Sequence, residues 1–78
     1  MPTVRKIGPY RLYFYANDRS EPVHVHVERE RFHAKFWVSP IRLAENQGFR
    51  PNEIIRLQKL IHEYQDEITE RWNEYFNS

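Results

Sequence analysis

The sequence predicts an α+β fold: an antiparallel sheet of four or five strands with a long C-terminal helix packed on one face. Residues 1–50 contain short runs rich in Val, Tyr and Phe that are separated by turn residues, which is typical of strands. Residues 51–76 contain no Gly and no Pro after Pro51 and place apolar side chains three and four positions apart, which is typical of a helix. A chain of 78 residues forms one domain with a small core. We therefore expect a single domain over 1–78, with its sheet in 1–50 and its helix in 51–76.

The composition excludes several classes of protein. The chain has no cysteine, which excludes disulfide bonds, thiolate metal sites and cysteine nucleophiles. It has no apolar run near the roughly 20 residues of a membrane span, and its N-terminal segment lacks the apolar stretch of a signal peptide. We therefore expect a cytoplasmic protein without membrane contacts, in which a homo-oligomer would compensate for the small core.

Charge is divided unevenly along the chain, although the net charge is only +1. Residues 1–50 carry nine Lys and Arg against five Asp and Glu, whereas residues 51–78 carry three against six. A basic sheet portion can meet an anion such as the phosphate of RNA, while exposed charge also serves solubility alone. Charge by itself leaves both interpretations open.

The apolar side chains of the predicted helix form a single stripe, so we expect the helix to cover the sheet. The stripe consists of Ile54, Leu57, Ile61, Tyr64, Ile68, Trp72 and Tyr75. A helix of about 25 residues would be about 37 Å long, roughly twice the length of a typical strand. Its far end must therefore overhang the sheet, bend between His62 and Asp66, or dock a partner.

The predicted strands follow one another from the N-terminus. The runs "TVRKI" and "YRLYFYA" flank a tight turn at Gly8-Pro9, with Leu12 and Phe14 facing the core, and "NDRSEP" is a loop by composition. In "VHVHVE" and "RFHAKFWV" apolar and polar residues alternate. Each of these two strands therefore has one apolar face.

The segment 40–49 has two alternative structures. It is either a fifth strand or a single helical turn, and Gly48 ends it in both cases. In either structure, Leu43 and Phe49 are expected to close the core next to Ile54.

The register of the two histidine-containing strands follows from their apolar faces. If both faces meet the same core, an odd-numbered residue of one strand opposes an even-numbered residue of the other. A two-residue loop at Arg29-Glu30 satisfies this condition. It gives the pairs Glu28 with Arg31, His26 with His33, and His24 with Lys35. A four-residue loop keeps the same parity and stays open, since Arg-Glu is not the Asn-Gly or Asp-Gly sequence that two-residue loops prefer.

The face of the sheet away from the helix would combine cations, aromatic rings and imidazoles. Its members are Arg11, Tyr13, Tyr15, His24, His26, His33, Lys35 and Trp37, with Glu28 at the edge as the only carboxylate. Such a face suits RNA or another phosphodiester, because cations meet phosphate, rings stack on bases and imidazoles transfer protons near neutral pH. A solvated face without activity is the plain alternative. Trp37 can instead pack beneath the loop that follows it.

A zinc site is a second alternative on this face. His24, His26 and His33 would offer three imidazoles, as catalytic zinc sites do, but the outer partners that hold such ligands in place are not identified by the sequence. We therefore assign no metal and no cofactor. His62 lies in "HEYQD", which lacks the second histidine of a metalloprotease helix motif, so we expect a solvated helix residue there.

The chain also carries a series of ordered motifs. They are "MPTV", "IG-Y" from Ile7, "FY-ND" from Phe14, "EP-HVHVE" from Glu21, "AKFW" from Ala34, "RLAEN-GF" from Arg42 and "W-EYF" from Trp72. Together they cover essentially the whole chain and resemble the small bacterial family called domain of unknown function 4160. His33 lies outside these motifs, and Arg50 stands where that family more usually has a helix-capping residue such as Ser.

The resemblance implies a toxin, because members of that family are often encoded next to a second small protein in candidate toxin-antitoxin modules. We expect a type II toxin that acts on RNA or the translation machinery, including the ribosome, with a cognate antitoxin encoded nearby as its partner. The most specific version of this hypothesis is that the chain is a metal-independent ribonuclease. The suspect positions within the shared motifs are Tyr15, Asn17, His24, His26, Lys35 and Trp37.

The roles in this hypothesis follow from the side chains. His24 or His26 would be the general acid or base, while Lys35 and Arg11 would stabilise charge on the phosphate. The RNA would be held by Tyr13, Tyr15, Asn17 and Trp37.

The alternative hypothesis is a non-enzymatic interaction module. In it, an overhanging helix docks a partner through exposed Trp72 and Tyr75, and the open face of the sheet has no catalytic role.

Overall fold

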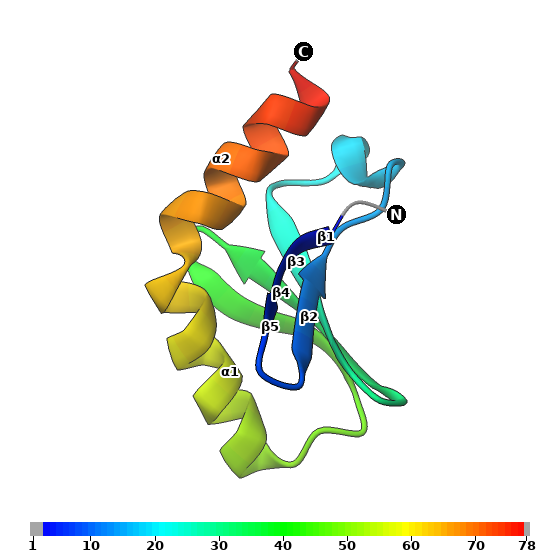
Figure 1. Ribbon diagram of the computed structural model, residues 1–78, viewed down its shortest axis with the longest axis vertical. Helices are drawn as coiled ribbons and strands as arrows, with labels where there is room; N and C mark the ends of the chain where they lie inside the picture. The colour runs from blue at the N-terminus through cyan, green and yellow to red at the C-terminus, as the bar shows by residue number, and fades with distance from the viewer. Residues whose placement is uncertain (1–2, 78) are drawn as a thin grey trace.

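The computed structural model describes residues 3–77 and has the predicted α+β architecture. Five strands form one antiparallel sheet in which each strand pairs with the next along the chain, and two helices lie along one side of it (Figure 1). The strands are β1 (Thr3–Ile7), β2 (Tyr10–Tyr13), β3 (His24–Arg29), β4 (Phe32–Val38) and β5 (Ile41–Gln47). A short 3-10 turn, η1 (Asp18–Ser20), precedes β3, and the helices are α1 (Pro51–Glu63) and α2 (Gln65–Phe76). Within residues 3–77, neither helix is long and apolar enough to cross a membrane.

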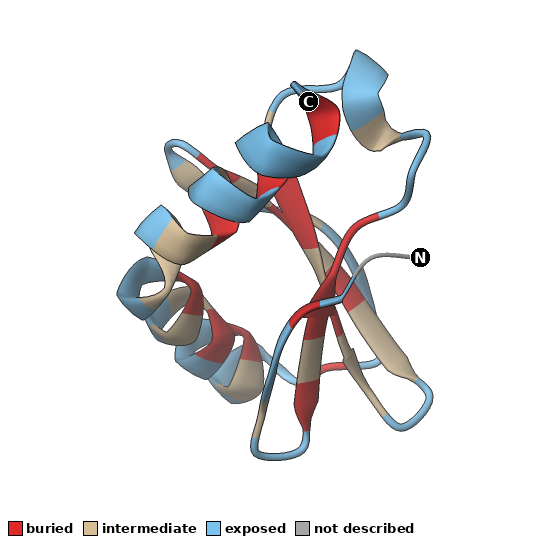
Figure 2. Ribbon diagram, turned by 45° about the horizontal axis from the view of Figure 1, so that its top comes forward, coloured by how far each residue is buried: buried red, intermediate tan, exposed pale blue. Residues whose placement is uncertain are grey.

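The core lies between the sheet and the two helices, as the apolar alternation predicts. Figure 2 shows buried residues on the facing sides of the sheet and the helices. The fully buried side chains include Leu12, Val25, Val27, Phe36 and Val38 from the sheet, and Leu57, Ile61 and Ile68 from the helices. The predicted helical stripe is wrong at its end, where Tyr75 is 45% exposed and Phe76 takes the buried position.

The helical segment is broken at Tyr64, which confirms a bend between His62 and Asp66. Tyr64 leaves helical geometry with a ψ of 16°. Beside it, Nε2 of Gln65 donates a hydrogen bond to the carbonyl of Val38 at 2.6 Å and so ties the break to the end of β4. Because of this bend α2 packs on the sheet, and Trp72 is only 6% exposed. The expectation that Trp72 is exposed for docking is therefore wrong.

The pairing of β3 with β4 differs from the predicted register by two residues. The observed pairs are His24 with Trp37, His26 with Lys35, and Glu28 with His33. The connecting residues are Glu30 and Arg31, and Glu30 supplies the positive φ, 55°, that such a tight loop requires. Arg29 still belongs to β3 and lies opposite Phe32. A shift of two residues leaves every side chain on its predicted face of the sheet.

The segment after β4 forms the strand β5, which confirms the first of its two alternatives. Gly48 ends the strand with a φ of 106°, and a Cβ at this position would collide with the ring of Phe32, so glycine is required. Phe49 is buried next to α1 as predicted. Leu43 is 39% exposed, because β5 is an edge strand and its register shifts beside Phe36, so its predicted place in the core is wrong.

A group of hydrogen-bonded polar side chains joins the end of β3 to α1, and we call Tyr10, Arg29 and Glu53 the Glu53 cluster. Arg29 donates from Nε and Nη2 to the two carboxylate oxygens of Glu53, each at 2.9 Å. The hydroxyl of Tyr10 donates to Oε2 of the same carboxylate at 2.7 Å. The hydrogen bonds from Arg29 and then from Tyr10 lower the pKa of Glu53. Both oxygens of this carboxylate therefore have good partners.

Candidate functional site

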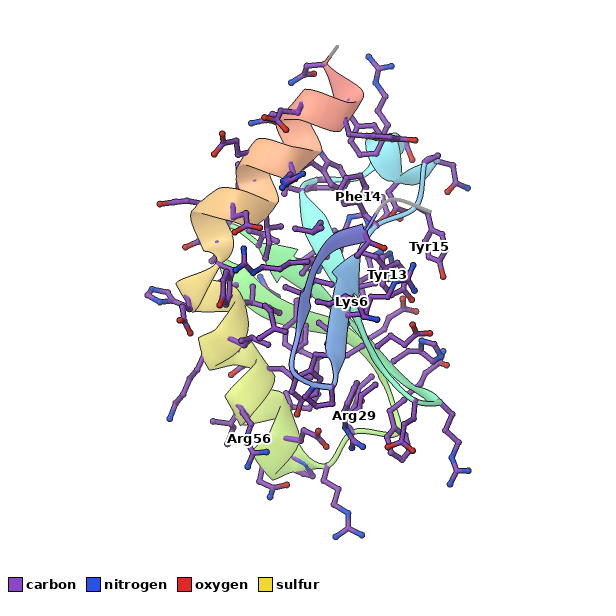
Figure 3. All side chains as sticks on the ribbon, in the orientation of Figure 1. Lys6, Tyr13, Phe14, Tyr15, Arg29 and Arg56 are labelled. Carbon is purple, nitrogen blue, oxygen red and sulfur yellow. The ribbon has the colours of Figure 1, made fainter. Side chains whose placement is uncertain are left out.

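The face of the sheet away from the helices carries two rows of side chains that run across the strands. Successive partners in the first row are Tyr13, His26, Lys35 and Glu45, and those in the second row are Arg11, Glu28, His33 and Gln47. Figure 3 shows Tyr13 and Tyr15 on this side of the sheet, while Phe14 lies between the sheet and α2. The predicted alternation of this segment is confirmed, although β2 itself ends at Tyr13.

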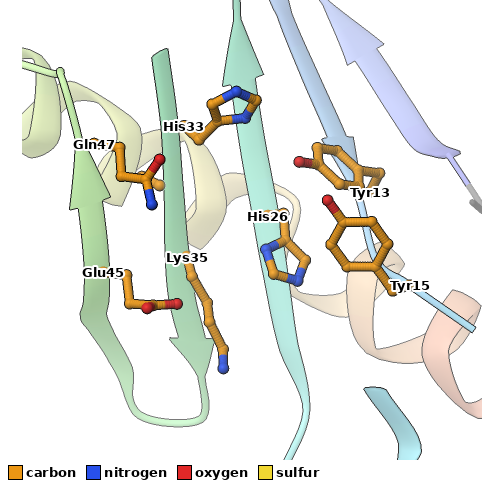
Figure 4. A pocket seen from close by; sticks show the side chains of 8 residues that line it. Tyr13, Tyr15, His26, His33, Lys35, Glu45 and Gln47 are labelled. Atoms are coloured by element: carbon orange, nitrogen blue, oxygen red, sulfur yellow. The ribbon is translucent and has the colours of Figure 1, made fainter. Parts of the chain in front are cut away.

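A pocket of about 250 Å³ lies over the two rows (Figure 4). It is lined by Tyr13, Tyr15, His26, His33, Ala34, Lys35, Glu45 and Gln47. The ring of Tyr13 stacks on the imidazole of His26 with 5.2 Å between centroids, and Tyr15 meets the same imidazole edge-on at 4.9 Å. Tyr15 is 40% exposed, so one aromatic ring at this end of the pocket is accessible to a ligand.

The turn η1 brings a carboxylate into contact with both histidines of β3, and we call Asp18, His24 and His26 the Asp18 cluster. The backbone N–H of Tyr15 donates a hydrogen bond to Oδ2 of Asp18 at 2.8 Å and fixes the carboxylate. The same oxygen accepts a hydrogen bond from Nε2 of His26 at 3.1 Å and lies 3.0 Å from Nε2 of His24. The expectation that Glu28 is the only carboxylate on this face is therefore wrong.

His24 is the buried member of the Asp18 cluster and has 0% exposed surface. Its ring centroid lies 5.0 Å from that of Trp72 on α2 and 5.7 Å from that of Trp37 on β4. Nδ1 donates a hydrogen bond to the carbonyl of Pro22 at 2.9 Å. Nε2 has no hydrogen-bond partner within residues 3–77, because the Asp18 carboxylate is close to it but not in hydrogen-bonding geometry. A side chain so enclosed cannot touch RNA directly, as its predicted catalytic role would require.

The surroundings shift the pKa values of three groups at the site. Burial alone would raise the pKa of Asp18, but this pKa is lowered, most of all by the hydrogen bond from the backbone N–H of Tyr15. Burial lowers the pKa of His26, against the opposing effect of Asp18. Burial, reinforced by the neighbouring Tyr15, raises the pKa of Tyr13. At neutral pH, Asp18 is therefore ionised, His26 is neutral and Tyr13 keeps its proton.

The two cations predicted to meet phosphate both have carboxylate partners. Nζ of Lys35 pairs with Glu21, whose side chain is 44% exposed, and lies 4.7 Å from the centroid of the Trp37 ring. Nη1 of Arg11 lies 3.0 Å from Oε1 of Glu28. Lys35 lines the pocket directly across from His26, whereas Arg11 lies in the second row and outside the pocket lining.

Of the remaining predicted residues, Asn17 and Trp37 lie outside the pocket lining, and His33 lies within it. Asn17 is exposed and precedes η1, and Trp37 is half-buried beside Lys35. His33 lines the pocket but lies opposite Glu28 on β3. The group that joins His24 and His26 is Asp18, so the hypothesis of a three-histidine site is wrong.

Four residues of this site were not predicted from the sequence: Asp18, Glu21, Glu45 and Gln47. The first two lie in a segment whose composition predicts a loop, and the last two lie in the segment 40–49, whose sequence is compatible with two structures. One signal for Asp18 was available, since an Asp in a turn often accepts a hydrogen bond from a nearby backbone N–H and so holds a fixed position.

Comparison with protein families classifies the chain. The model of a family described as a domain of unknown function, DUF4160, matches residues 10–73. The chain belongs to the DUF4160 family. No curated protein matches it, and no solved structure does. The DUF4160 match includes both rows of the open face and the whole Asp18 cluster, so the candidate site lies within the family domain.

Proposed function

We propose that this DUF4160 protein is the toxin of a bacterial type II toxin-antitoxin pair and that it acts on RNA bound to the open face of its sheet. The observation that supports this most is a single pocket in which His26, His33 and Lys35 lie together with two tyrosine rings. Recognition of single-stranded RNA requires a cation for the phosphate and flat groups for the bases, and this pocket offers both.

The aromatic side chains of the pocket suit one unpaired nucleobase. The pocket, about 250 Å³, is smaller than the roughly 300–1,000 Å³ of sites that enclose a whole small molecule. The exposed ring of Tyr15, supported by Tyr13 and His26, offers a surface for a base to stack on. Stacking on an aromatic side chain contributes about 1–3 kcal/mol per base and tolerates any base. We therefore expect binding of single-stranded RNA without a strict sequence preference.

The phosphate of the RNA would replace Glu21 as the partner of Lys35. An ion pair at the protein surface contributes only about 0–1 kcal/mol, and the Glu21 side chain is 44% exposed, so a phosphate can compete with it. A phosphodiester at Lys35 would lie near the imidazoles of His26 and His33. Strand cleavage is the reaction that suits this set of groups. A cognate antitoxin would keep the protein inactive by covering the same face.

RNA binding by matched variants tests this proposal. The purified chain is titrated into fluorescently labelled single-stranded RNA, and the anisotropy gives the Kd. We expect Tyr15→Ala and Lys35→Ala each to weaken binding at least about 5-fold, the equivalent of the smallest stacking contribution. Lys59→Ala and His62→Ala remove a cation and an imidazole from the exposed side of α1 and should bind as the wild type does.

Growth of a bacterial host tests the toxin role. Induction of the wild-type chain should arrest growth, and the double variant Tyr15→Ala/Lys35→Ala, shown to be folded by circular dichroism, should not. Arrest by both chains would contradict the assignment of this face. Absence of both RNA binding and arrest at matched expression would overturn the proposal and favour the interaction module.

A further inference from the structure

We propose that the Asp18 cluster binds one divalent transition-metal ion through Oδ2 of Asp18 and Nε2 of His24 and His26. One ligand atom from each of the three side chains lies within 4.8 Å of the others. The inference goes beyond RNA binding and does not depend on it. It also changes the ligand set from three imidazoles to two imidazoles and a carboxylate, because Asp18 stands where His33 was expected.

The protonation of His24 is the first argument for this site. Nδ1 faces a carbonyl oxygen, that of Pro22, and must carry a proton to donate to it. In the neutral imidazole Nε2 then bears a lone pair. That lone pair lies 3.0 Å from a carboxylate oxygen of Asp18, with no hydrogen bond between them. Two electron-rich atoms held this close in a buried place repel each other unless a cation binds both.

The alternative without a metal requires His24 to carry protons on both nitrogens. A cation would then lie at a position with 0% exposed surface. Burial of a charged group is costly unless its hydrogen bonds are satisfied, and here the Nε2 hydrogen bond is not formed. A bound ion accounts for the same geometry without a buried, unsatisfied imidazolium.

The outer contacts of the cluster are those that metal ligands usually have. Histidine ligands commonly donate the second ring N–H to a carbonyl or carboxylate, which fixes the tautomer and the ring orientation, and His24 does this with Pro22. The carboxylate of Asp18 is fixed by the backbone N–H of Tyr15. The ligand atoms are therefore held in place before an ion binds.

The distances also fit a small ion. The rings of His24 and His26 are nearly perpendicular, at 86°, and both present Nε2 to the same carboxylate oxygen. Ligands at about 2.0–2.1 Å from a tetrahedral ion are about 3.3 Å apart. The observed separations of 3.0 and 3.1 Å from Asp18 Oδ2 need only a small adjustment, and the ion would replace the hydrogen bond between His26 and Asp18.

The donor set indicates the class of ion. Imidazole and carboxylate ligands suit Zn²⁺ and Fe²⁺, and two histidines with one carboxylate leave further coordination positions open. His26 belongs both to this cluster and to the wall of the pocket. An ion at the cluster would therefore lie beside the pocket, where an open position can take water or a phosphate oxygen.

Metal titration of the whole chain tests the inference without RNA. The purified protein is treated with EDTA, dialysed, and titrated with Zn²⁺ by calorimetry. We expect one ion per chain. We also expect Asp18→Asn and His26→Ala to weaken the affinity by at least about 10-fold, the effect that loss of even an outer partner of a ligand has. The matched control variants are His33→Ala and His62→Ala, which should bind Zn²⁺ as the wild type does.

A measurement on the wild-type chain makes the test independent of how the variants fold. Long-range ¹H–¹⁵N spectra resolve the imidazole nitrogens of the four histidines. On addition of Zn²⁺, Nε2 of His24 and His26 should shift, while the nitrogens of His33 and His62 should stay in place. Shifts confined to His33 or His62, or no saturable binding at millimolar Zn²⁺, would overturn the site.

Discussion

The two ends of β3 carry two polar clusters of the same size and opposite character. The strand begins in the Asp18 cluster and ends in the Glu53 cluster. Each consists of one carboxylate with two partners. In the Glu53 cluster, Arg29 and Tyr10 donate three well-formed hydrogen bonds to two oxygens. In the Asp18 cluster, both imidazoles converge on one oxygen, and one buried nitrogen lacks a hydrogen bond.

The difference teaches how a structural cluster is told from a candidate site. A satisfied polar network contributes to stability and leaves no atom for a ligand. A buried polar atom without a partner is costly, so its presence calls for an explanation, and a role as a metal ligand is one such explanation. On this criterion the Glu53 cluster stabilises the fold, and the Asp18 cluster is the place where we propose a ligand.

The largest effect is expected from removing the side chain of α2 that packs on the Asp18 cluster. Trp72→Ala removes the ring that packs on His24 and Phe14, and we expect the free energy of unfolding to fall by about 3–5 kcal/mol. Urea denaturation followed by circular dichroism measures this loss. The exposed neighbour Arg71, changed to Ala, is the control and should cost little. A loss below 1 kcal/mol for Trp72→Ala, on the scale of a surface substitution, would show that α2 does not close the cluster.

The next largest effect is expected from Zn²⁺, which should stabilise the chain through the Asp18 cluster and not through the Glu53 cluster. With free Zn²⁺ at 100 times its Kd, the free energy of unfolding should rise by about 2.7 kcal/mol, because the ion binds the folded chain. Denaturation with and without EDTA measures the gain. The variant Glu53→Gln should gain as much as the wild type, while Asp18→Asn, with its at least about 10-fold weaker affinity, should gain no more than about 1.4 kcal/mol. An equal gain in Asp18→Asn would place the ion elsewhere.

Acid should weaken the contribution of the Glu53 cluster to the free energy of unfolding. Glu53→Gln is expected to cost about 1.5–3 kcal/mol at neutral pH, because it removes hydrogen bonds to a charged group. The pKa of Glu53 is lowered in the folded chain from its ordinary value of 4.5 by Arg29 and Tyr10. The contribution is therefore complete above pH 4.5 and is lost as the pH falls through the lowered pKa. Unfolding curves of both chains across this range should converge at low pH, and a constant difference would refute the assignment.

The smallest effect is expected from replacing the unsatisfied imidazole. His24→Leu, measured in EDTA, should change the free energy of unfolding by no more than about 1 kcal/mol, because the lost hydrogen bond from Nδ1 to Pro22 is offset by removal of a buried nitrogen that lacks one. At the other end of β3, Arg29→Leu should cost clearly more, since it leaves the carboxylate of Glu53 without its main partner. A loss for His24→Leu that equals the loss for Arg29→Leu would mean that His24 is as well satisfied as Arg29.

Periodicity was sufficient to predict most of the fold. Alternation in β3 and β4 and the three-and-four spacing after Pro51 gave the sheet, the helices and the face that each strand presents. Periodicity did not predict the register between β3 and β4, because Glu30 adopts a positive φ that composition does not favour and Arg29 remains in the strand. The bend at Tyr64 is one of the three alternatives that the length of the helical segment left open.

The candidate site was predicted only in part. The alternation placed His26, Lys35 and Tyr13 on one face, and they do line one pocket. The role of Asp18 depends on the path of the chain through η1, which no periodicity describes. The burial of His24 depends on α2 reaching across the sheet after the bend, a tertiary contact between segments far apart in sequence.

The order of the strands in the sheet, which is the order of the chain, also bears on when each cluster can form. The polar atoms that join Asp18 to His26 are eight residues apart in sequence, whereas Tyr10 and Glu53 are 43 apart. Sheets whose paired strands are close in sequence fold faster than sheets whose paired strands are far apart. The N-terminal part of a chain is also synthesised first. The three proposed ligands of the ion can thus come together before α1 and α2 have packed on the sheet. The proposed ion would then bind before the core closes, and it would stabilise the sheet before α2 packs on it.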